Sequence, residues 1–231
     1  MNKIIFLSIL LIASFAMAFS NNQQKPVGPA ADAWNELGQD FFAKTDWPAT
    51  SIKKIINSGL PPKALANALH FFNENDHRID NQDVLVITDF TQPAYRKRLF
   101  VIHNDGRFET HLVAHGYGSG GLGATPHRFG DRKGKNETPP GFLITTDDIR
   151  SSKKRPYAIL LEGLERRNRN SSARGILFHG TYKYVRENPD RSTGFVGRSE
   201  GCLTVDSEVA KKIAPIIRGG SLIYNYTPFD R

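Results

Sequence analysis

Apolar positions follow two different periods along this 231-residue chain, a helical one first and a strand-like one later. Before residue 76 the apolar side chains recur at helical spacing, as Trp34, Leu37 and Phe41 show at positions i, i+3 and i+7. Leu65 and Leu69 line one stripe of a further helix, which two successive prolines at 61 and 62 can open. We therefore expect residues 30–80 to form a helical segment that packs on the rest of the chain.

After residue 83 the pattern becomes that of strands. Runs rich in β-branched and aromatic residues occur at 84–87, 98–103, 108–115, 141–146, 157–161, 175–178, 202–205 and 221–226. Asn-Asp-Gly at 104–106 predicts a hairpin between the second and third runs, because these residues tolerate the positive φ of tight turns. Asp206 is expected to cap a helix over 207–217, which two glycines at 219 and 220 end.

Residues 116–141 lie between two of the expected strands and are rich in glycine and charged residues. A connection of this length in a compact domain is usually functional, mobile or both. The helical segment at 30–80 and a β-rich domain at 81–231 then account for the chain from residue 30 onward.

The first eighteen residues resemble a secretory signal. Lys3 supplies a positive start, residues 4–16 are almost continuously apolar, and Ala16-Met17-Ala18 provides the small residues of a cleavage site. The apolar run is too short for a comfortable membrane span, and the polar leader at 19–29 follows it at once. We expect cleavage after Ala18, hence export, with no stable membrane anchor afterwards.

Composition and charge limit the classes of molecule that the protein is expected to bind. Hydrophobic residues at 39% argue against a disordered chain. The net charge of +8 becomes +7 when the signal and its Lys3 are removed, and it favours acidic partners. Because export takes the protein away from nucleic acid, anionic envelope polymers are the expected partners.

The chain has one cysteine, Cys202, which excludes an internal disulfide and any CxxC-type metal or redox site. A buried structural cysteine is one interpretation. The setting favours a nucleophile, because Gly201 lets backbone N–H groups approach a substrate carbonyl and Arg198 would favour the thiolate.

A cysteine nucleophile needs a base, and His179 is the best placed of the seven histidines. It ends an apolar run, so the imidazole would stand at the rim of a strand while the carbonyl of Gly180 orients it. His111 and His115 are four positions apart on an expected strand and would share one face.

Two short segments, FHGT at 178–181 and SEGCL at 199–203, resemble the catalytic signature of the L,D-transpeptidases, the YkuD-type catalytic domain. The segments at 113–116, 138–142, 160–164 and 173–176 add to the resemblance, especially to the murein L,D-transpeptidase branch with S-x-G-C. The similarity extends over about residues 84–226. It implies a mainly β (α+β) fold: a YkuD-like β-sandwich or barrel with short helices and an N-terminal helical segment.

The resemblance also implies a mechanism. Cys202 would attack the carbonyl of the third residue of a peptidoglycan stem tetrapeptide, His179 would act as base and acid, and the Gly180 carbonyl would orient the imidazole. D-Alanine would leave and a thioester would remain. An amine would resolve the thioester to a 3→3 cross-link, and water would give L,D-carboxypeptidase activity. No cofactor is needed, because thiolate, imidazolium and backbone donors supply the chemistry.

Five further residues are candidates for oxyanion or substrate binding, each with an ordinary structural alternative: Gly201, Ser199, Arg198, His115 and Tyr182. The partners implied are peptidoglycan stem peptides, with no nucleic acid. We expect a monomer in the periplasm of a Gram-negative envelope.

The chain departs from the family pattern in three ways. Glu200 stands where the family usually has histidine, and Thr204 stands where it usually has arginine or asparagine. The separation of His179 and Cys202, 202 − 179 = 23, is longer than usual, and an insertion at 187–193 would explain it.

Three other interpretations remain at this stage. A metal hydrolase would use His111 and His115, although no third ligand is evident. A non-catalytic wall-binding protein would keep the fold and use its positive charge. A sortase-like transpeptidase also orders histidine before cysteine, but the short spacing fits it poorly.

Overall fold

Two helices begin the part of the chain that the computed structural model describes, residues 49–122, 124–186 and 195–230. They are α4 (Ala49–Asn57) and α5 (Pro62–Glu74), followed by the 3-10 turn η1 (Asp76–Arg78). Pro62 stands at the start of α5, where its missing N–H removes no helical hydrogen bond. The predicted helix around Trp34 and the predicted signal lie outside the described residues. Among the described helices, none has the length and hydrophobicity that crossing a bilayer requires.

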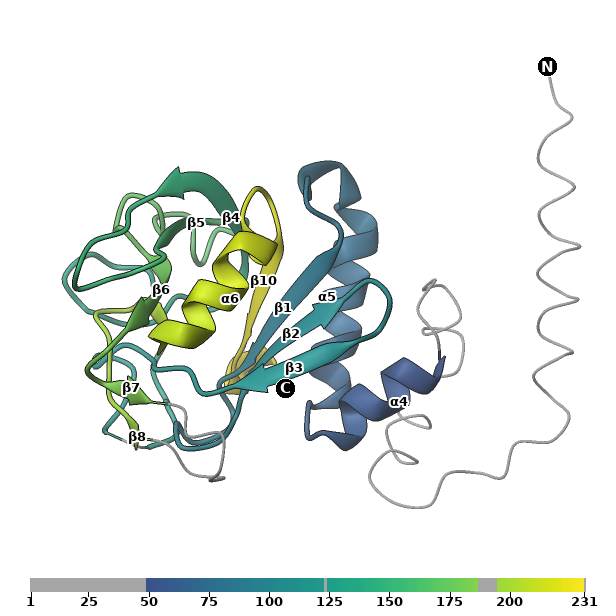
Figure 1. Cartoon of the computed structure of the whole chain (residues 1–231), viewed down its shortest axis with the longest axis horizontal. Coiled ribbons are helices and arrows are strands. Elements are labelled where there is room, and N and C mark those ends of the chain that lie inside the picture. Colours follow the sequence, from purple (N-terminus) through teal and green to yellow (C-terminus); the bar gives the residue numbers. More distant parts are fainter. Residues whose placement is uncertain (1–48, 123, 187–194, 231) are drawn as a thin grey trace, which may run out of the picture.

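One eight-stranded sheet forms the body of the molecule (Figure 1). Its strands are β1 (Val84–Asp89), β2 (Leu99–His103), β3 (Phe108–His111), β4 (Gly141–Ile149), β5 (Ile159–Gly163), β6 (Leu177–Thr181), β9 (Leu203–Asp206) and β10 (Leu222–Tyr226). Their spatial order is β3-β2-β1-β10-β4-β5-β6-β9. The pairs β1–β10 and β6–β9 are parallel and the others are antiparallel. The sequence did not predict the small ribbon of β7 (Val185–Arg186) and β8 (Phe195–Val196).

The sheet nearly closes on itself, because the chain that leaves one edge strand crosses to the other. After β3, the N–H of Ala114 donates to the carbonyl of Thr204 over 2.8 Å, which forms an antiparallel bridge to β9. The strand expected over 108–115 therefore ends at His111. Buried Arg98 bonds the carbonyl of Val113, and residue 114 pairs with β9, so residues 112–115 are drawn away from β2.

Two hydrophobic cores lie on opposite faces of the sheet. On one face, α4 and α5 pack against β1, β2 and β10, with Leu65, Leu85 and Tyr224 in the same cluster. On the other face, α6 (Ser207–Ile217) packs against β6 and β9 as well as β1, and Figure 1 shows the helices on either side. The predicted cap of α6 is confirmed: the side chain of Asp206 accepts from the N–H of Glu208 over 2.9 Å.

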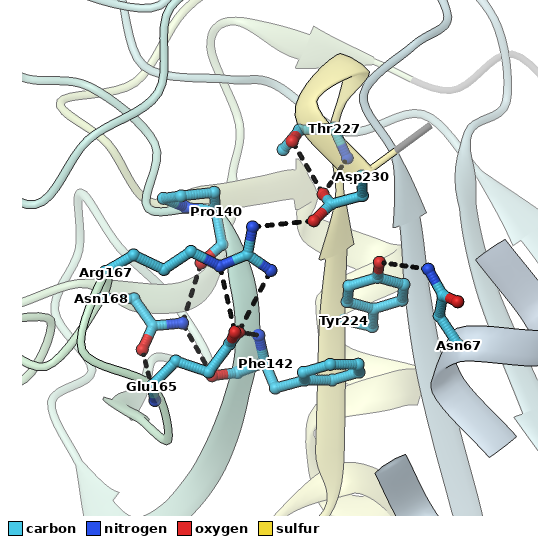
Figure 2. A network of polar contacts seen from close by, with 9 residues as sticks. All are labelled: Asn67, Pro140, Phe142, Glu165, Arg167, Asn168, Tyr224, Thr227 and Asp230. Atoms are coloured by element: carbon cyan, nitrogen blue, oxygen red, sulfur yellow. Dashed lines mark hydrogen bonds and ion pairs between the residues drawn. The ribbon is translucent and has the colours of Figure 1, made fainter. Parts of the chain in front are cut away.

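A polar network, shown in Figure 2, connects the turn after β5 to the C-terminal 3-10 turn η2 (Pro228–Asp230). Arg167 lies between Glu165, at 3.1 Å, and Asp230, at 2.7 Å. The amide of Asn168 donates to the carbonyls of Pro140 and Phe142, each over 2.8 Å. These contacts fix the turn that leads into β6, so they set where the residues at the start of β6 lie.

Candidate active site

The pairing of β6 with β9 places Cys202 and His179 on one face of the sheet. His179 is the partner of Thr204 in this parallel pair, and Phe178 is the partner of Leu203. Phe178 and Leu203 are buried in the core beneath α6. Because strand side chains alternate, His179, Thr204 and Cys202 point to the opposite face. Cys202 packs there in a small cluster with Ala158, Leu160 and Leu177.

Both nitrogens of the His179 imidazole have partners. Nδ1 lies 2.8 Å from the carbonyl oxygen of Gly180, and Nε2 lies 3.0 Å from Oγ1 of Thr204. Burial lowers the pKa of His179 to about 4; the contact with Gly180 opposes this shift, and the charge of Arg155 adds to it. The imidazole is therefore neutral at pH 7.

Gly180 also brings α6 close to the site. A Cβ at this position would lie 2.9 Å from Cβ of Ala210 and 3.0 Å from Cα of Ser207, both in α6. A side chain would therefore push the helix away from β6 and disturb the strand that carries His179.

Cys202 is 7% exposed, and its Sγ lies 3.8 Å from the carbonyl oxygen of Gly175. Burial raises the pKa of the thiol, while the backbone of Leu177 and the charge of Arg155 act against the rise. Across the residues that the structure describes, no hydrogen bond joins Cys202 to His179. The free protein thus holds a neutral thiol and a neutral imidazole on the same face of the sheet.

The turn before Cys202 is fixed by Ser199. Its Oγ donates to the carbonyl of Cys202 over 2.7 Å and accepts from the N–H of Gly201 over 3.1 Å. The N–H of Ser199 donates to the carbonyl of His115, and the N–H of Tyr117 donates to the carbonyl of Ser199, each over 2.8 Å. The amide of Gly201, a predicted oxyanion donor, is therefore engaged with Ser199 in this structure.

His115 contributes to the site through its backbone, since its side chain is fully buried against Arg98. Nη2 of Arg98 lies 2.9 Å from Nδ1 of His115. A guanidinium can only donate, so Nδ1 accepts and the neutral imidazole carries its hydrogen on Nε2. Burial, first, and the charge of Arg98 lower the pKa of His115 to about 4.

The expected pairing of His111 and His115 on one strand face is wrong, because β3 ends at His111. Nε2 of His111 instead lies 3.1 Å from a carboxylate oxygen of Glu109, on its own strand. Within the described ranges, no three His, Cys, Asp or Glu side chains gather closely enough to hold a metal ion.

Two predicted residues are exposed, whereas the thiol and the imidazole are buried. Tyr182 is 56% exposed in the turn after β6, and Arg198 is exposed beside Ser199. The charge of Arg198 acts on His115, whereas the cations that act on Cys202 are Arg155 and Arg174.

Sequence reasoning missed Arg155, an exposed residue in the hairpin between β4 and β5. The N–H of Gly180 donates to the carbonyl of Pro156 over 2.8 Å, and this bond holds the hairpin against the end of β6. The only available signal was the basic run Lys153-Lys154-Arg155 before a proline, which indicates a turn without indicating its neighbours.

Arg174 stands between the thiol side of the sheet and a cavity. Its Nη1 donates to the carbonyl of Gly130 over 2.8 Å and pairs with Asp131 at 3.3 Å, and its Nη2 donates to the carbonyl of Glu137 over 2.6 Å. The cavity measures about 470 Å³. It is lined by Asp131, Arg132, Lys133, Asn170, Ala173 and Arg174. Gly175, whose carbonyl contacts the thiol of Cys202, directly follows the cavity residue Arg174 in sequence.

The fold is mainly β, with a buried cysteine directly before β9 and a histidine on the adjacent parallel strand β6. The chain belongs to the L,D-transpeptidase catalytic domain family, whose model matches residues 56–226. No curated protein matches the chain.

Several solved structures are distantly similar. An L,D-transpeptidase from Mycobacterium smegmatis is 16% identical, with a TM-score of 0.37, and the match covers 63% of this chain and 59% of that one. An L,D-transpeptidase from Stackebrandtia nassauensis is 16% identical, with a TM-score of 0.38 and coverages of 87% and 68%. The helical cell-shape-determining protein Pgp2 from Campylobacter jejuni is 16% identical, with a TM-score of 0.37, and the match covers 64% of this chain and 48% of that one. The chain thus spans less than two thirds of the first and third of these proteins, 59% and 48%.

Proposed function

We propose that this protein is an exported L,D-transpeptidase that acts on peptidoglycan stem tetrapeptides with Cys202 as nucleophile and His179 as general base and acid. The family match and the placement of both side chains on one face of β6 and β9 support the proposal. The placement is the main support for the proposal. In sequence 22 residues lie between His179 and Cys202, and only the parallel pairing of β6 with β9 brings them together.

In the first half-reaction, Nε2 of His179 takes the thiol proton as Sγ attacks the carbonyl of the third residue of the donor stem. The tetrahedral intermediate collapses when the C–N bond to D-alanine breaks, and the imidazolium returns the proton to the leaving amine. A thioester on Cys202 remains. The nearby guanidiniums of Arg155 and Arg174 favour the thiolate during attack.

In the second half-reaction, the amine of a second stem attacks the thioester and gives up a proton to His179. The C–S bond breaks, the imidazolium returns the proton to the sulfur to restore the thiol, and the product is a 3→3 cross-link. The cavity beside Arg174 has basic residues, Arg132 and Lys133, in its lining, and these suit the carboxylates of a stem peptide. Export through the signal at 1–18 would bring the enzyme to this substrate in the periplasm.

The experiment is incubation with purified sacculi followed by mass spectrometry of the muropeptides. We expect dimers that lack one D-alanine. New tripeptides alone would identify water as the acceptor, and unchanged muropeptides would contradict the enzyme proposal and favour a wall-binding protein.

The variants Cys202→Ala and His179→Ala test the mechanism in the same assay. Each should lower release of D-alanine by about 10³-fold or more, because nucleophile and base act as a unit. His70→Ala, at an exposed position on α5, is the matched control and should release D-alanine at the wild-type rate. Wild-type turnover in both site variants would refute the mechanism.

A further inference from the structure

We propose that Thr204 and Tyr184 are positioning residues for His179: their hydroxyls form a chain that ends on Nε2 of the imidazole and competes there with the thiol of Cys202. This inference rests on the proposed function for its catalytic meaning, whereas the chain of hydroxyls is itself a feature of the fold.

The chain has two links. Thr204 faces His179 across the β6–β9 pair, and its Oγ1 lies 3.0 Å from Nε2. The hydroxyl of Tyr184 then donates to Oγ1 of Thr204 over 3.4 Å. Thr204 is fully buried, so its hydroxyl has these two side chains as partners rather than bulk water.

The direction of each hydrogen bond follows from the carbonyl at the far end. The oxygen of Gly180 can only accept, so Nδ1 of His179 carries the hydrogen of the neutral imidazole. Nε2 then presents its lone pair, which accepts from the hydroxyl of Thr204. Because the hydroxyl of Thr204 has given its hydrogen to Nε2, its oxygen can only accept, and the hydroxyl of Tyr184 is therefore the donor to it. The hydrogen bonds thus run from Tyr184 through Thr204 and His179 to Gly180.

The backbone around Tyr184 holds its ring in place. A Cβ on Gly197 would lie 2.7 Å from Cβ of Tyr184 and 3.0 Å from its carbonyl oxygen, so only glycine permits this approach. The N–H of Gly197 also donates to that carbonyl. Tyr184 packs, half-buried, against a cluster formed by Ala94, Leu112, Ala114, Val185 and Val196. The phenol therefore reaches Thr204 from a rigid support.

The hydroxyl of Thr204 occupies the lone pair that the proposed mechanism needs. The thiol of Cys202 meanwhile lies near the carbonyl of Gly175. Proton transfer from the thiol to His179 requires the hydrogen of Thr204 to turn away from Nε2. Turning away costs that hydrogen bond, and a methyl group in place of the hydroxyl would remove this cost. Thr204 therefore sets how readily the thiol loses its proton.

Other charged and polar groups surround the pair and stay constant across the variants below. Those that act on the thiol are Arg155, Arg174 and Glu200, and the one that acts on His179 is Arg155.

The single cysteine makes the test direct, because protein labelled with ¹³Cβ-cysteine has one titrating thiol signal in NMR. In the full chain, Thr204→Val should lower the pH midpoint of this titration by about 0.5 to 1 pH unit, the effect of losing one hydrogen bond. The acid limb of kcat/KM for D-alanine release reports protonation of the base, His179, and it should move to higher pH by a similar amount, because Nε2 loses the donor that stabilises the neutral imidazole. Tyr184→Phe should shift each quantity in the same direction as Thr204→Val but by less, because it only weakens the donor.

Thr204→Ser is the matched control, since it keeps the hydroxyl, and it should titrate as wild type. An unchanged midpoint in Thr204→Val, or an equal shift in Thr204→Ser, would overturn the proposal in favour of a packing effect. If Thr204→Val does not fold, Tyr184→Phe decides, and an unshifted midpoint there overturns it. A shifted midpoint in a protein whose wild type releases no D-alanine would uphold the hydroxyl chain and refute the proposed function instead.

Discussion

Gly201 determines how the chain enters the strand that carries the thiol. Its φ of +115° lies where L side chains are rarely found. A Cβ here would lie 2.9 Å from the carbonyl oxygen of Glu137 and 3.1 Å from Nη2 of Arg174. The backbone oxygen cannot move without disturbing the loop, so both conformation and space favour glycine at this residue.

Gly201→Ala should therefore destabilise the fold by about 1 to 3 kcal/mol and lower D-alanine release by about 10²-fold through displacement of the thiol. Urea unfolding and the muropeptide assay measure the two effects. Gly59→Ala is the matched control, because Gly59 has a similar φ of +103° with no atom within 4 Å of the added Cβ. It should cost stability alone. Equal loss of turnover in both variants would contradict the steric argument.

At the scale of elements, Arg98 joins segments that the sheet alone would leave apart. Its Nη1 donates to the carbonyl of Gln92 over 2.7 Å, and its Nη2 donates to the carbonyl of Val113 over 2.9 Å. The guanidinium also lies 4.9 Å from the centre of the Phe90 ring. Burial lowers the pKa of Arg98 to about 9, so it stays charged at pH 7. Arg98 thus holds the crossing segment 112–115, which in turn supports Ser199.

Arg98→Leu should lower the free energy of unfolding by about 3 to 5 kcal/mol, because it leaves buried carbonyls and the Nδ1 of His115 without their donor. Urea denaturation at pH 7 gives the value. Arg96→Leu, at an exposed position two residues earlier, should change it by less than about 0.5 kcal/mol. A wild-type urea midpoint for Arg98→Leu would show that the crossing segment does not depend on this contact.

At the scale of the whole molecule, two buried neutral histidines link stability to pH. The pKa of His115 and that of His179 are both lowered to about 4 by burial, below the ordinary value near 6.5. Between these values the unfolded chain binds protons that the folded protein does not. Stability is therefore highest above about pH 6.5 and falls as the pH drops toward 4. Asp89, whose pKa burial raises, acts in the opposite sense.

The contribution of His179 can be isolated by comparing urea unfolding of wild type and His179→Gln at pH 7 and pH 5. The variant should lose about 2 kcal/mol less than wild type between these two pH values, because it removes one of the two protonation differences. His70→Gln, at an exposed position, should follow the wild-type dependence. An identical pH dependence in all three proteins would contradict a neutral buried His179.

Local chemistry allowed many elements to be predicted from sequence. The capped helix over 207–217 matches α6 at both ends, because Asp206 caps its start and the glycines at 219 and 220, both with positive φ, follow its end. The Asn-Asp-Gly hairpin is confirmed for the same reason, since β2 and β3 pair on either side of it. Cys202 and His179 were both proposed from their own neighbours in sequence, and the family match confirms the resemblance that those neighbours indicated.

Contacts between residues far apart in the chain determined the features that could not be predicted from sequence. Only the β6–β9 register places Thr204 against His179, and only the approach of Gly197 brings Tyr184 to Thr204. Arg155 is a turn residue by sequence and a neighbour of the thiol by the bond between Gly180 and Pro156. The sequence by itself therefore determined most of the elements and the family, and it nominated the proposed reactive pair, because propensity, capping and short motifs act over a few residues. The tertiary structure alone determined the partners of that pair and the length of β3, because those depend on contacts between residues far apart in the chain.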